Sequence, residues 1–298
     1  MAKPIRNMRA SVRTRLLHHA KQRNQQFQLL LTRYVLERLL YRLSLTKHRD
    51  HFVLKGAMLM TNWFADPHRQ TRDVDFLGFG NPDPEMMLDV FREICTVEVD
   101  DGVDIDIAAL RADQIREGLE YGGLRIKTTA VVGGARVNVV IDIGFGDAIE
   151  PGLEEIELPV LLDLPAPRLR AYVRETVIAE KFQAMVMLGR ANSRMKDIYD
   201  IWILSRTYEF TGDRLARAIA ATFARRQTAI PVEPPDALTS AFAEDAVKRQ
   251  QWAAFVNDVA AQPGSLAGVL DDLVAFLMPQ AAQARMLGAP EMDGSREP

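Results

Sequence analysis

The sequence predicts a mixed α/β domain at the N-terminus, followed by an all-helical domain. At 298 residues the chain exceeds the usual size of one domain, so two packed units are expected. Before about residue 150, stretches with period-two hydrophobicity alternate with helical stretches, whereas only helical periodicity follows Arg174. Prolines interrupt the stretch between the two parts. We therefore expect an α/β domain over residues 1–160, a helical domain over 168–279 and a disordered tail over 280–298.

The composition is that of an ordinary globular protein, with 48% hydrophobic and 26% charged residues. No apolar run approaches the ~18 residues that span a bilayer, and the first residues, Met1 to Pro4, lack the apolar core of a signal peptide. We therefore expect a cytoplasmic protein that does not contact a membrane. The single cysteine, Cys95, lies among apolar residues and has no second cysteine to pair with, so we interpret it as a core residue.

The net charge of -3 conceals two segments of opposite sign. Residues 1–50 carry twelve Lys and Arg against two acids, whereas residues 83–106 carry nine acids against one base. A basic face next to an acidic region suits a protein that binds a polyanion and also holds cations. The alternative is that solvated helix faces simply differ in sign.

The first expected elements are amphipathic helices from Met8 to about Leu43. Their apolar residues recur at helical spacing, with Arg33, Arg38 and Arg42 between them, which predicts a basic outer side. Short strands are expected at 52–55, 73–76, 97–99, 103–107, 124–130 and 135–143, the last two forming a hairpin around Gly133-Gly134. Helices are expected at 57–64, 84–95, 176–188, 194–205, 212–225, 236–242, 245–261 and 266–277.

Asp73 and Asp75 are the first candidate functional residues. One residue separates them in a predicted strand, so both carboxylates should lie on the same face, about 6–7 Å apart. Such a pair can hold Mg²⁺, which prefers a few carboxylates together with substrate phosphate oxygens. The pattern alone is weak, because Asp104 and Asp106 repeat it, and the alternative is a solvent-facing strand edge.

Asp142 strengthens the case for a metal site. It lies inside an apolar strand, where an unpaired carboxylate is costly to bury, so it needs an arginine or a metal as its partner. A third carboxylate from a neighbouring strand would complete a two-metal site or activate an attacking hydroxyl. The alternative is an internal salt bridge to Arg136 or Arg125, and we favour the metal site.

Lys55, Gly56 and Ala57 occupy a predicted junction between a strand and a helix. A glycine there lets a phosphate approach backbone N–H groups, and the N-terminus of the helix adds favourable partial charge. The alternative is a simple turn. Arg72 directly precedes the paired acids, where it could hold a carboxylate, a phosphate or a structural ion partner.

Two further groups of cations are candidates in the helical domain. Lys181 lies on an otherwise apolar stripe, so its ammonium needs an anion, either a remote carboxylate or a bound triphosphate. Asn192 or Ser193 is expected to cap the next helix, whose first turn carries Arg194 and Lys196 and could bind an anion. The acids that follow, Asp197 and Asp200, are explained adequately as partners of the helix dipole.

Four blocks of this sequence resemble the AbiEii/AbiGii nucleotidyltransferase toxins, also called the MenT type, within the DNA polymerase beta-like nucleotidyltransferase superfamily. The blocks are residues 55–57 with 72–75, residues 141–144, residues 178–184 and residues 194–200. The resemblance implies an NTP substrate, Mg²⁺, an RNA acceptor such as tRNA in several members, and a cognate antitoxin. In the superfamily a serine follows the glycine of the first block, whereas this chain has Ala57.

The expected function is therefore Mg²⁺-dependent transfer of a nucleoside monophosphate from an NTP to an acceptor, expected to be RNA (tRNA), in a cleft between the two domains. We expect Asp73 and Asp75 to bind the metal, and Asp142 to complete the metal site or act as the base. The expected nucleotide-binding residues are Lys55, Gly56, Ala57, Arg72, Lys181, Arg194 and Lys196, with Lys181 and Asp197 also counted as catalytic. One alternative is the same fold acting on a protein or small molecule, and another is a catalytically silent binding protein.

Overall fold

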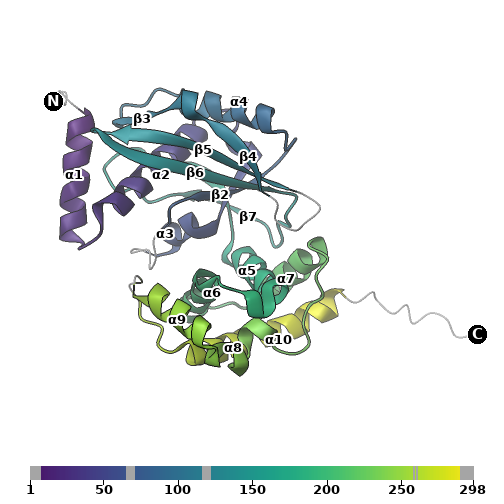
Figure 1. The fold of residues 1–298 in the computed structure, drawn as a ribbon. Coiled ribbons are helices and arrows are strands. Elements are labelled where there is room, and N and C mark those ends of the chain that lie inside the picture. Colours follow the sequence, from purple (N-terminus) through teal and green to yellow (C-terminus); the bar gives the residue numbers. More distant parts are fainter. Residues whose placement is uncertain (1–7, 65–70, 116–121, 258, 260, 289–298) are drawn as a thin grey trace, which may run out of the picture. The chain divides into compact units, whose positions relative to one another are not determined.

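The computed structural model describes residues 8–64, 71–115, 122–257, 259 and 261–288. By contact, the chain divides into two compact units, which we call the sheet unit and the helical unit (Figure 1). The sheet unit comprises Met1–Gly146 and Glu154–Tyr172, and the helical unit comprises Asp147–Leu153 and Val173–Pro298. This mixed α/β unit with an all-helical companion confirms the predicted fold class.

The sheet has eight strands in the described part of the chain. They are β1 (Phe52–Lys55), β2 (Val74–Gly78), β3 (Val103–Ile105), β4 (Arg111–Ile115), β5 (Gly123–Val132), β6 (Ala135–Phe145), β7 (Leu153–Glu157) and β8 (Arg168–Tyr172). Their order is β3-β5-β6-β2-β1-β8-β7, and β4 also pairs with β5. The sheet is mixed, because β2 with β6 and β1 with β8 are parallel, whereas β1 with β2 and β5 with β6 are antiparallel.

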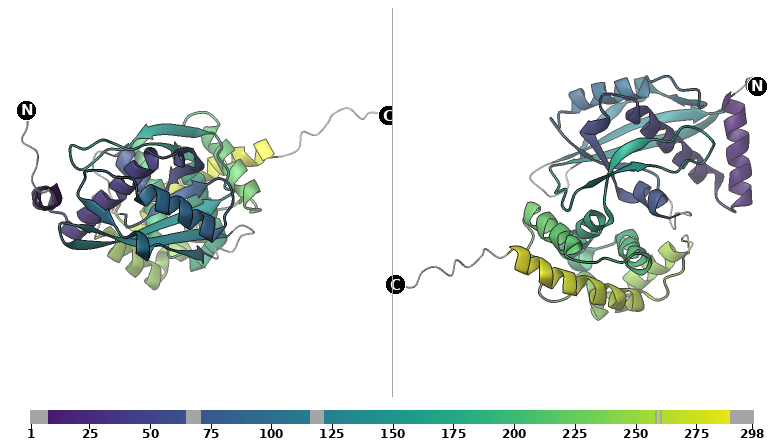
Figure 2. Two further views of the ribbon diagram at one scale, coloured as in Figure 1. Left: turned by 90° about the horizontal axis from the view of Figure 1, so that it is seen from above. Right: turned by 180° about the vertical axis from the view of Figure 1, so that it is seen from behind.

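The two faces of the sheet differ in polarity. Alternate residues of β5 and β6, such as Ile126 and Ile141, are fully buried. Helix α2 (Phe27–Ser44) packs against β6 and against α4 (Pro84–Cys95), so these helices cover the apolar face, as the two views in Figure 2 show. The intervening residues, Asp142 among them, point to the opposite face and are partly exposed. Side chains on this polar face are the ones that can meet a ligand.

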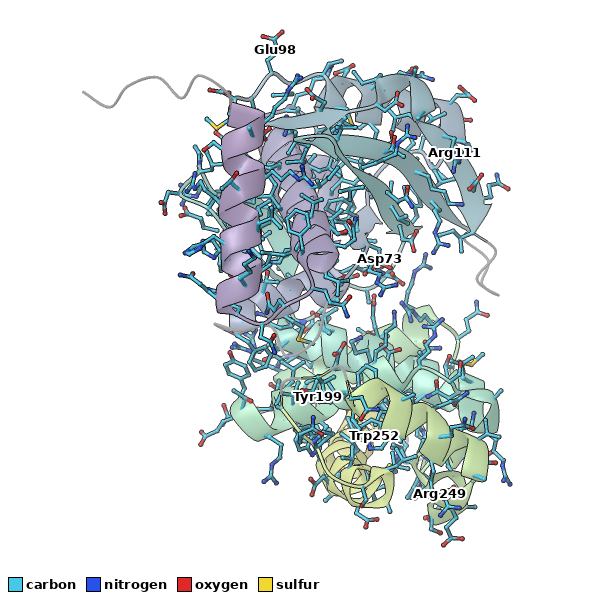
Figure 3. All side chains as sticks on the ribbon, turned by 60° about the vertical axis from the view of Figure 1, so that its left-hand side comes forward. Asp73, Glu98, Arg111, Tyr199, Arg249 and Trp252 are labelled. Carbon is cyan, nitrogen blue, oxygen red and sulfur yellow. The ribbon has the colours of Figure 1, made fainter. Side chains whose placement is uncertain are left out.

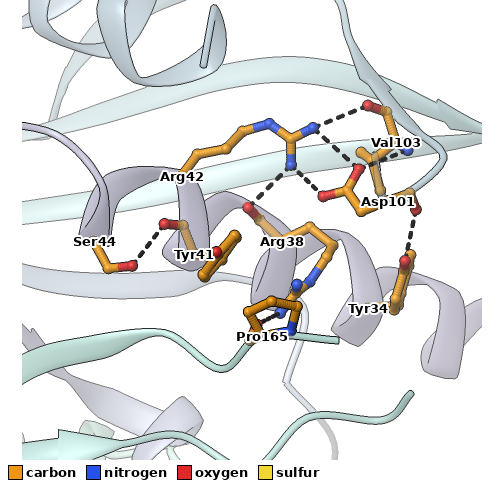
Figure 4. Close-up of polar contacts among 8 residues, drawn as sticks. All are labelled: Tyr34, Arg38, Tyr41, Arg42, Ser44, Asp101, Val103 and Pro165. Carbon is orange, nitrogen blue, oxygen red and sulfur yellow. Dashed lines mark hydrogen bonds and ion pairs between the residues drawn. The ribbon is translucent and has the colours of Figure 1, made fainter. Parts of the chain in front are cut away.

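Two of the three arginines of α2 are buried, so the prediction of a basic outer side is wrong at Arg38 and Arg42. Arg42 forms two hydrogen bonds with the carboxylate of Asp101, at 2.6 and 3.1 Å, and Arg38 donates to the carbonyl oxygen of Pro165 at 2.9 Å (Figure 4). The reason is that α2 is covered on several sides, by the sheet, by α4 and by α1 (Met8–Gln22). Cations on such a helix need internal partners.

The two oppositely charged segments of the sequence pair with each other. Among the described residues, three Lys or Arg ion pairs join residues 1–50 to residues 83–106, namely Arg9–Asp104, Arg42–Asp101 and Lys47–Glu93, and His48 also lies 2.9 Å from Glu93. Part of the positive charge that suggested a polyanion-binding surface is therefore balanced by acids of the same unit. Arg13 and Lys21 on α1 remain exposed.

The helical unit contains six α-helices among the described residues. They are α5 (Arg174–Leu188), α6 (Met195–Thr207), α7 (Arg214–Arg225), α8 (Ser240–Glu244), α9 (Ala246–Val256) and α10 (Leu266–Gly288). Helix α10 continues through Pro279, because the buried Ala281 and Ala284 extend the apolar stripe of Leu277. The tail expected from residue 280 is therefore helical as far as Gly288, and its remainder lies outside the described residues.

Other elements also differ from prediction. Residues 97–99 form no strand, since the chain bends there toward Asp101, whose carboxylate is bound by Arg42. Strands β4, β7 and β8 were not predicted, and β8 places residues 168–172 in the sheet unit instead of the helical one. Nearby prolines and the short length of β7 and β8 conceal their alternation. No helix among the described residues is long and apolar enough to cross a lipid bilayer.

Candidate active site

Four charged residues form one row across the polar face of the sheet. The backbone register pairs Asp75 of β2 with Lys55 of β1 on one side and with Asp142 of β6 on the other. Asp142 is paired in turn with Arg125 of β5. Residues paired in this way point to the same face, with Cα atoms about 5 Å apart. The sheet thus brings two acids together between two bases.

The backbone of Gly56 lies against the side chain of Asp75. Its φ is +72°, and a β-carbon built there would lie 2.0 Å from Oδ2 of Asp75, so only glycine fits. Gly56–Leu59 forms a 3-10 turn, and the α-helix that follows, α3 (Met60–Trp63), has only four residues. The junction that was expected to open a helix therefore opens a 3-10 turn followed by a single short turn of α-helix. The glycine instead makes room for the carboxylate of Asp75.

The other expected nucleotide-binding residues of the sheet unit, Lys55, Ala57 and Arg72, differ in their contacts and in their exposure. The Nζ atom of Lys55 lies 5.8 Å from the centre of the Tyr172 ring, in cation–π geometry. Ala57 is buried and offers no polar side chain, while Arg72 is exposed. Lys55 is thus the cation that the strand register brings next to Asp75.

Asp73 directly precedes β2 and is labelled in Figure 3. Its Oδ1 atom accepts a hydrogen bond from the Thr71 hydroxyl at 3.1 Å, and its side chain is partly exposed. Val74 and Phe76 on either side of Asp75 are buried, as the strand alternation predicted. The carboxylates of Asp73 and Asp75 can therefore be reached from the polar face while their neighbours anchor the strand.

Asp142 is paired with Arg125, one of the two arginines that the sequence offered as salt-bridge partners. Nε and Nη2 of Arg125 donate to Oδ1 and Oδ2 of Asp142 at 2.7 and 2.6 Å, a two-pronged pair. The hydrogen bonds that Arg125 donates to Asp142 raise the pKa of Arg125, although desolvation lowers it, and the charges of Asp142, Asp73 and Asp75 raise it further. One guanidinium therefore lies in the field of all three carboxylates.

The carboxylates on the polar face of the sheet can be compared with the ligands that a divalent cation needs. Among the described residues, no group of three or more acidic, histidine or cysteine side chains is arranged to hold a metal. Mg²⁺ is commonly held by one or two carboxylates together with substrate phosphates. Asp73 and Asp75 could supply those carboxylates, whereas both oxygens of Asp142 are bonded to Arg125.

In the helical unit, Lys181 of α5 binds two acids of α6. Its Nζ atom lies 2.6 Å from Oδ1 of Asp197 and 2.9 Å from Oδ2 of Asp200, and the exposed fractions of the three side chains are 13%, 7% and 0%. Of the two partners considered for Lys181, the structure contains the carboxylate. It also corrects the interpretation of Asp197 and Asp200 as mere helix-dipole partners.

The start of α6 differs from its expected capping. Arg194 is the N-cap residue, and no side chain caps the helix. The side-chain oxygen of the buried Asn192 instead accepts a hydrogen bond from the backbone N–H of Arg194 at 2.9 Å. Arg194 and Lys196 are exposed, and Nη1 of Arg194 lies 4.0 Å from Asp197. These two cations are the ones available to an anion at this end of α6.

Sequence reasoning missed an ionic cluster around Arg226, at the end of α7. Its Nη2 atom lies 3.0 Å from Asp147 and 3.2 Å from Glu180, and Nη1 donates to Gln183 at 3.0 Å. Because Asp147 begins the segment that follows β6, this cluster fixes that segment to α5 and α7. Helical periodicity does not predict this cluster, since its members, Arg226 included, come from three separate segments.

Comparison with known proteins gives a family match and several matching solved structures, among them two from H. pylori. The family described as "Nucleotidyl transferase AbiEii toxin, Type IV TA system" matches residues 38–275. A candidate nucleotidyltransferase from H. pylori has a similar structure, with 15% sequence identity and a TM-score of 0.51, covering 88% of this chain and 99% of its own. JHP933 from Helicobacter pylori gives 15% identity and a TM-score of 0.49, covering 88% and 92%. None of the curated proteins matches this sequence.

Proposed function

The chain belongs to the AbiEii family of nucleotidyl transferase toxins of type IV toxin–antitoxin systems, and on this premise we propose that it transfers a nucleoside monophosphate from an NTP to an RNA acceptor with the aid of Mg²⁺. In such a step the acceptor hydroxyl oxygen bonds to the α-phosphorus, the bond from that phosphorus to the bridging α–β oxygen breaks, and pyrophosphate leaves. The hydroxyl proton passes to a carboxylate of the site or to water.

The observation that carries the proposal is the side-by-side placement of Asp75 and Asp142, with Asp73 two residues before Asp75. We assign Asp73 and Asp75 to the metal and Asp142 to its completion, with the role of base as the alternative for Asp142. A bound Mg²⁺ would neutralise triphosphate charge and polarise the phosphorus under attack. Gly56 supports this arrangement, because it leaves the space that the Asp75 carboxylate occupies.

Each unit, considered by itself, carries proposed nucleotide-binding residues. In the sheet unit, Lys55 and Arg72 are the charged candidates, and Gly56 and Ala57 would contribute backbone only. In the helical unit, Arg194 and Lys196 are exposed, and we propose that they bind phosphate. Two carboxylates already balance Lys181, so its proposed share in phosphate binding is smaller than theirs, and it holds Asp197 in place.

RNA is proposed as the acceptor, and tRNA in particular, because the family resemblance implies it and α1 exposes Arg13 and Lys21. Fewer N-terminal cations are available to RNA than the sequence suggested, since several of them have acidic partners. A cognate antitoxin is the proposed protein partner, in keeping with the toxin–antitoxin family. The proposed place of action is the cytoplasm, where NTPs and tRNA occur together.

The test is a labelling reaction with each α-labelled NTP, total cellular RNA and either Mg²⁺ or a chelator. The proposal expects labelled RNA in the tRNA size range, formed with Mg²⁺ and wild-type protein and absent with Asp75→Asn. A label in protein or in a small molecule would favour the same fold with another acceptor. If no NTP labels any acceptor, the catalytically silent alternative is favoured.

A further inference from the structure

Arg125 is the least expected member of the row of charges on the sheet. Its guanidinium forms two parallel hydrogen bonds to the two oxygens of Asp142. The side chains are 40% and 20% exposed, so this pair lies at the polar surface of the sheet and is not sealed in the core. A pair at such a surface can open without unfolding the strands that carry it.

The surroundings of Arg125 contain more negative than positive charge. Asp73 and Asp75 both contribute to raising its pKa, after Asp142 itself. The next cation on the same face of β5 is Lys127, whose Nζ atom is bound to Asp113 at 2.7 Å. Arg125 is therefore the cation on β5 that offsets the repulsion among the three carboxylates.

We propose that Arg125 is a built-in counter-cation of this site, which competes with a divalent metal for Asp142. Without metal, Arg125 holds both oxygens of Asp142, and Asp142 becomes available to the metal only when Arg125 releases it. This inference rests on the proposed function, because it takes Asp73 and Asp75 as the first metal ligands. Arg125 then acts through Asp142 as a positioning residue that sets the metal affinity.

A purely supportive role for Arg125 predicts the opposite result. A side chain that orients a metal ligand by hydrogen bonding strengthens metal binding, so its removal weakens the affinity. A competing cation weakens metal binding, so its removal tightens the affinity. The direction of the change in the dissociation constant therefore distinguishes the two roles.

The experiment is titration of the full-length protein with Mn²⁺, followed by electron paramagnetic resonance of the free ion. Arg125→Gln should bind Mn²⁺ roughly ten- to a hundred-fold more tightly than wild type, the equivalent of one charge-assisted interaction. Lys127→Gln is the matched control, because it removes the same charge from the same face of β5 without touching Asp142, and it should leave the affinity nearly unchanged. Unchanged or weaker binding by Arg125→Gln would overturn the inference.

A double variant tests whether the effect passes through Asp142. In Arg125→Gln combined with Asp142→Asn, the gain in Mn²⁺ affinity should disappear. If the double variant binds as tightly as Arg125→Gln alone, the gain is long-range electrostatics and the inference fails. Should Arg125→Gln not fold, Arg125→Lys serves instead, since lysine keeps the charge but cannot contact both oxygens in parallel, and it should give a smaller gain in the same direction.

Asp75→Asn separates this inference from the proposed function. If Asp75→Asn binds Mn²⁺ as well as wild type does, the proposed metal site itself is wrong. If Asp75→Asn loses Mn²⁺ while Arg125→Gln leaves the affinity unchanged, the metal site stands and only the competition by Arg125 is refuted.

Discussion

A β-carbon at residue 56 would lie 2.0 Å from Oδ2 of Asp75, so Gly56 and Asp75 depend on each other for space. Gly56→Ala should displace the Asp75 carboxylate, lower transferase activity strongly and reduce stability. Gly212→Ala is the matched control, because Gly212 has a similar φ of +69° with nothing within 4 Å of the added carbon. Both variants bear the strain of positive φ, about 1–2 kcal/mol.

The difference between the two variants isolates the clash. Gly56→Ala should lose about 1–3 kcal/mol more than Gly212→Ala in the free energy of unfolding, measured by urea denaturation. Equal losses, with transferase activity retained by Gly56→Ala, would mean that Asp75 tolerates displacement and that its position is not critical.

Asp73→Ala should abolish transfer without lowering the Tm of the metal-free protein. The substitution removes a proposed metal ligand, while it also relieves repulsion between neighbouring carboxylates. The Asp73 side chain accepts a half-buried hydrogen bond from the Thr71 hydroxyl, two residues away, so the substitution removes a local contact and, among the described residues, no long-range one of this kind. Thermal unfolding in a chelator, monitored by circular dichroism, decides the matter. A Tm far below that of wild type would make Asp73 a structural residue.

Lys181→Met should strongly destabilise the protein, because it leaves Asp197 and Asp200 buried without their shared cation. Removing one partner of a buried ion pair typically costs about 3–5 kcal/mol. Lys196→Met, which replaces an exposed lysine on α6, should change the free energy of unfolding by less than about 0.5 kcal/mol. Chemical denaturation without nucleotide measures both. Equal stability of Lys181→Met and wild type would indicate that the important partner of Lys181 is a phosphate of the nucleotide and not the two carboxylates.

Neutralising Arg13 and Lys21 together should weaken RNA binding and reduce its dependence on salt. Each lost phosphate contact lowers the slope of log K against log salt by about 0.7–0.9, so a change of roughly 1.5 is expected. Arg92→Gln on α4, where Arg92 is already paired with Asp89, should have little effect. Filter binding between 50 and 200 mM salt, a range chosen because such contacts respond steeply there, gives the slopes. Identical slopes for all proteins would place the RNA elsewhere.

Parts of the site follow directly from the sequence. Gly133 and Gly134 form the two-residue turn of the β5–β6 hairpin, and a turn at that point pairs Arg125 with Asp142. The same register pairs Arg136 with Val131, so the hairpin alone selects Arg125 over Arg136. The alternation around Asp73 and Asp75 likewise predicts which side chains are buried.

Other parts depend on contacts between distant segments, which periodicity does not record. Arg42 is buried together with its partner Asp101, which is 59 residues away in the sequence. Helical spacing alone placed Arg42 on the outer side of the helix. The stripe on α5 showed that Lys181 needs an anion, but the choice of Asp197 and Asp200 depends on how α5 packs on α6. Strand β8 pairs with β1 across more than a hundred residues, and its five residues follow a proline.

The most direct test of nucleotidyl transfer compares NTP labelled at the α-phosphate with NTP labelled at the γ-phosphate, in parallel reactions with wild-type protein, Mg²⁺ and cellular RNA. The account predicts that only the α-label enters the acceptor, that the γ-label appears in pyrophosphate in equal amount, and that Asp75→Asn forms neither product. Transfer of the γ-label to the acceptor, or α-label transfer that persists in Asp75→Asn, would contradict it.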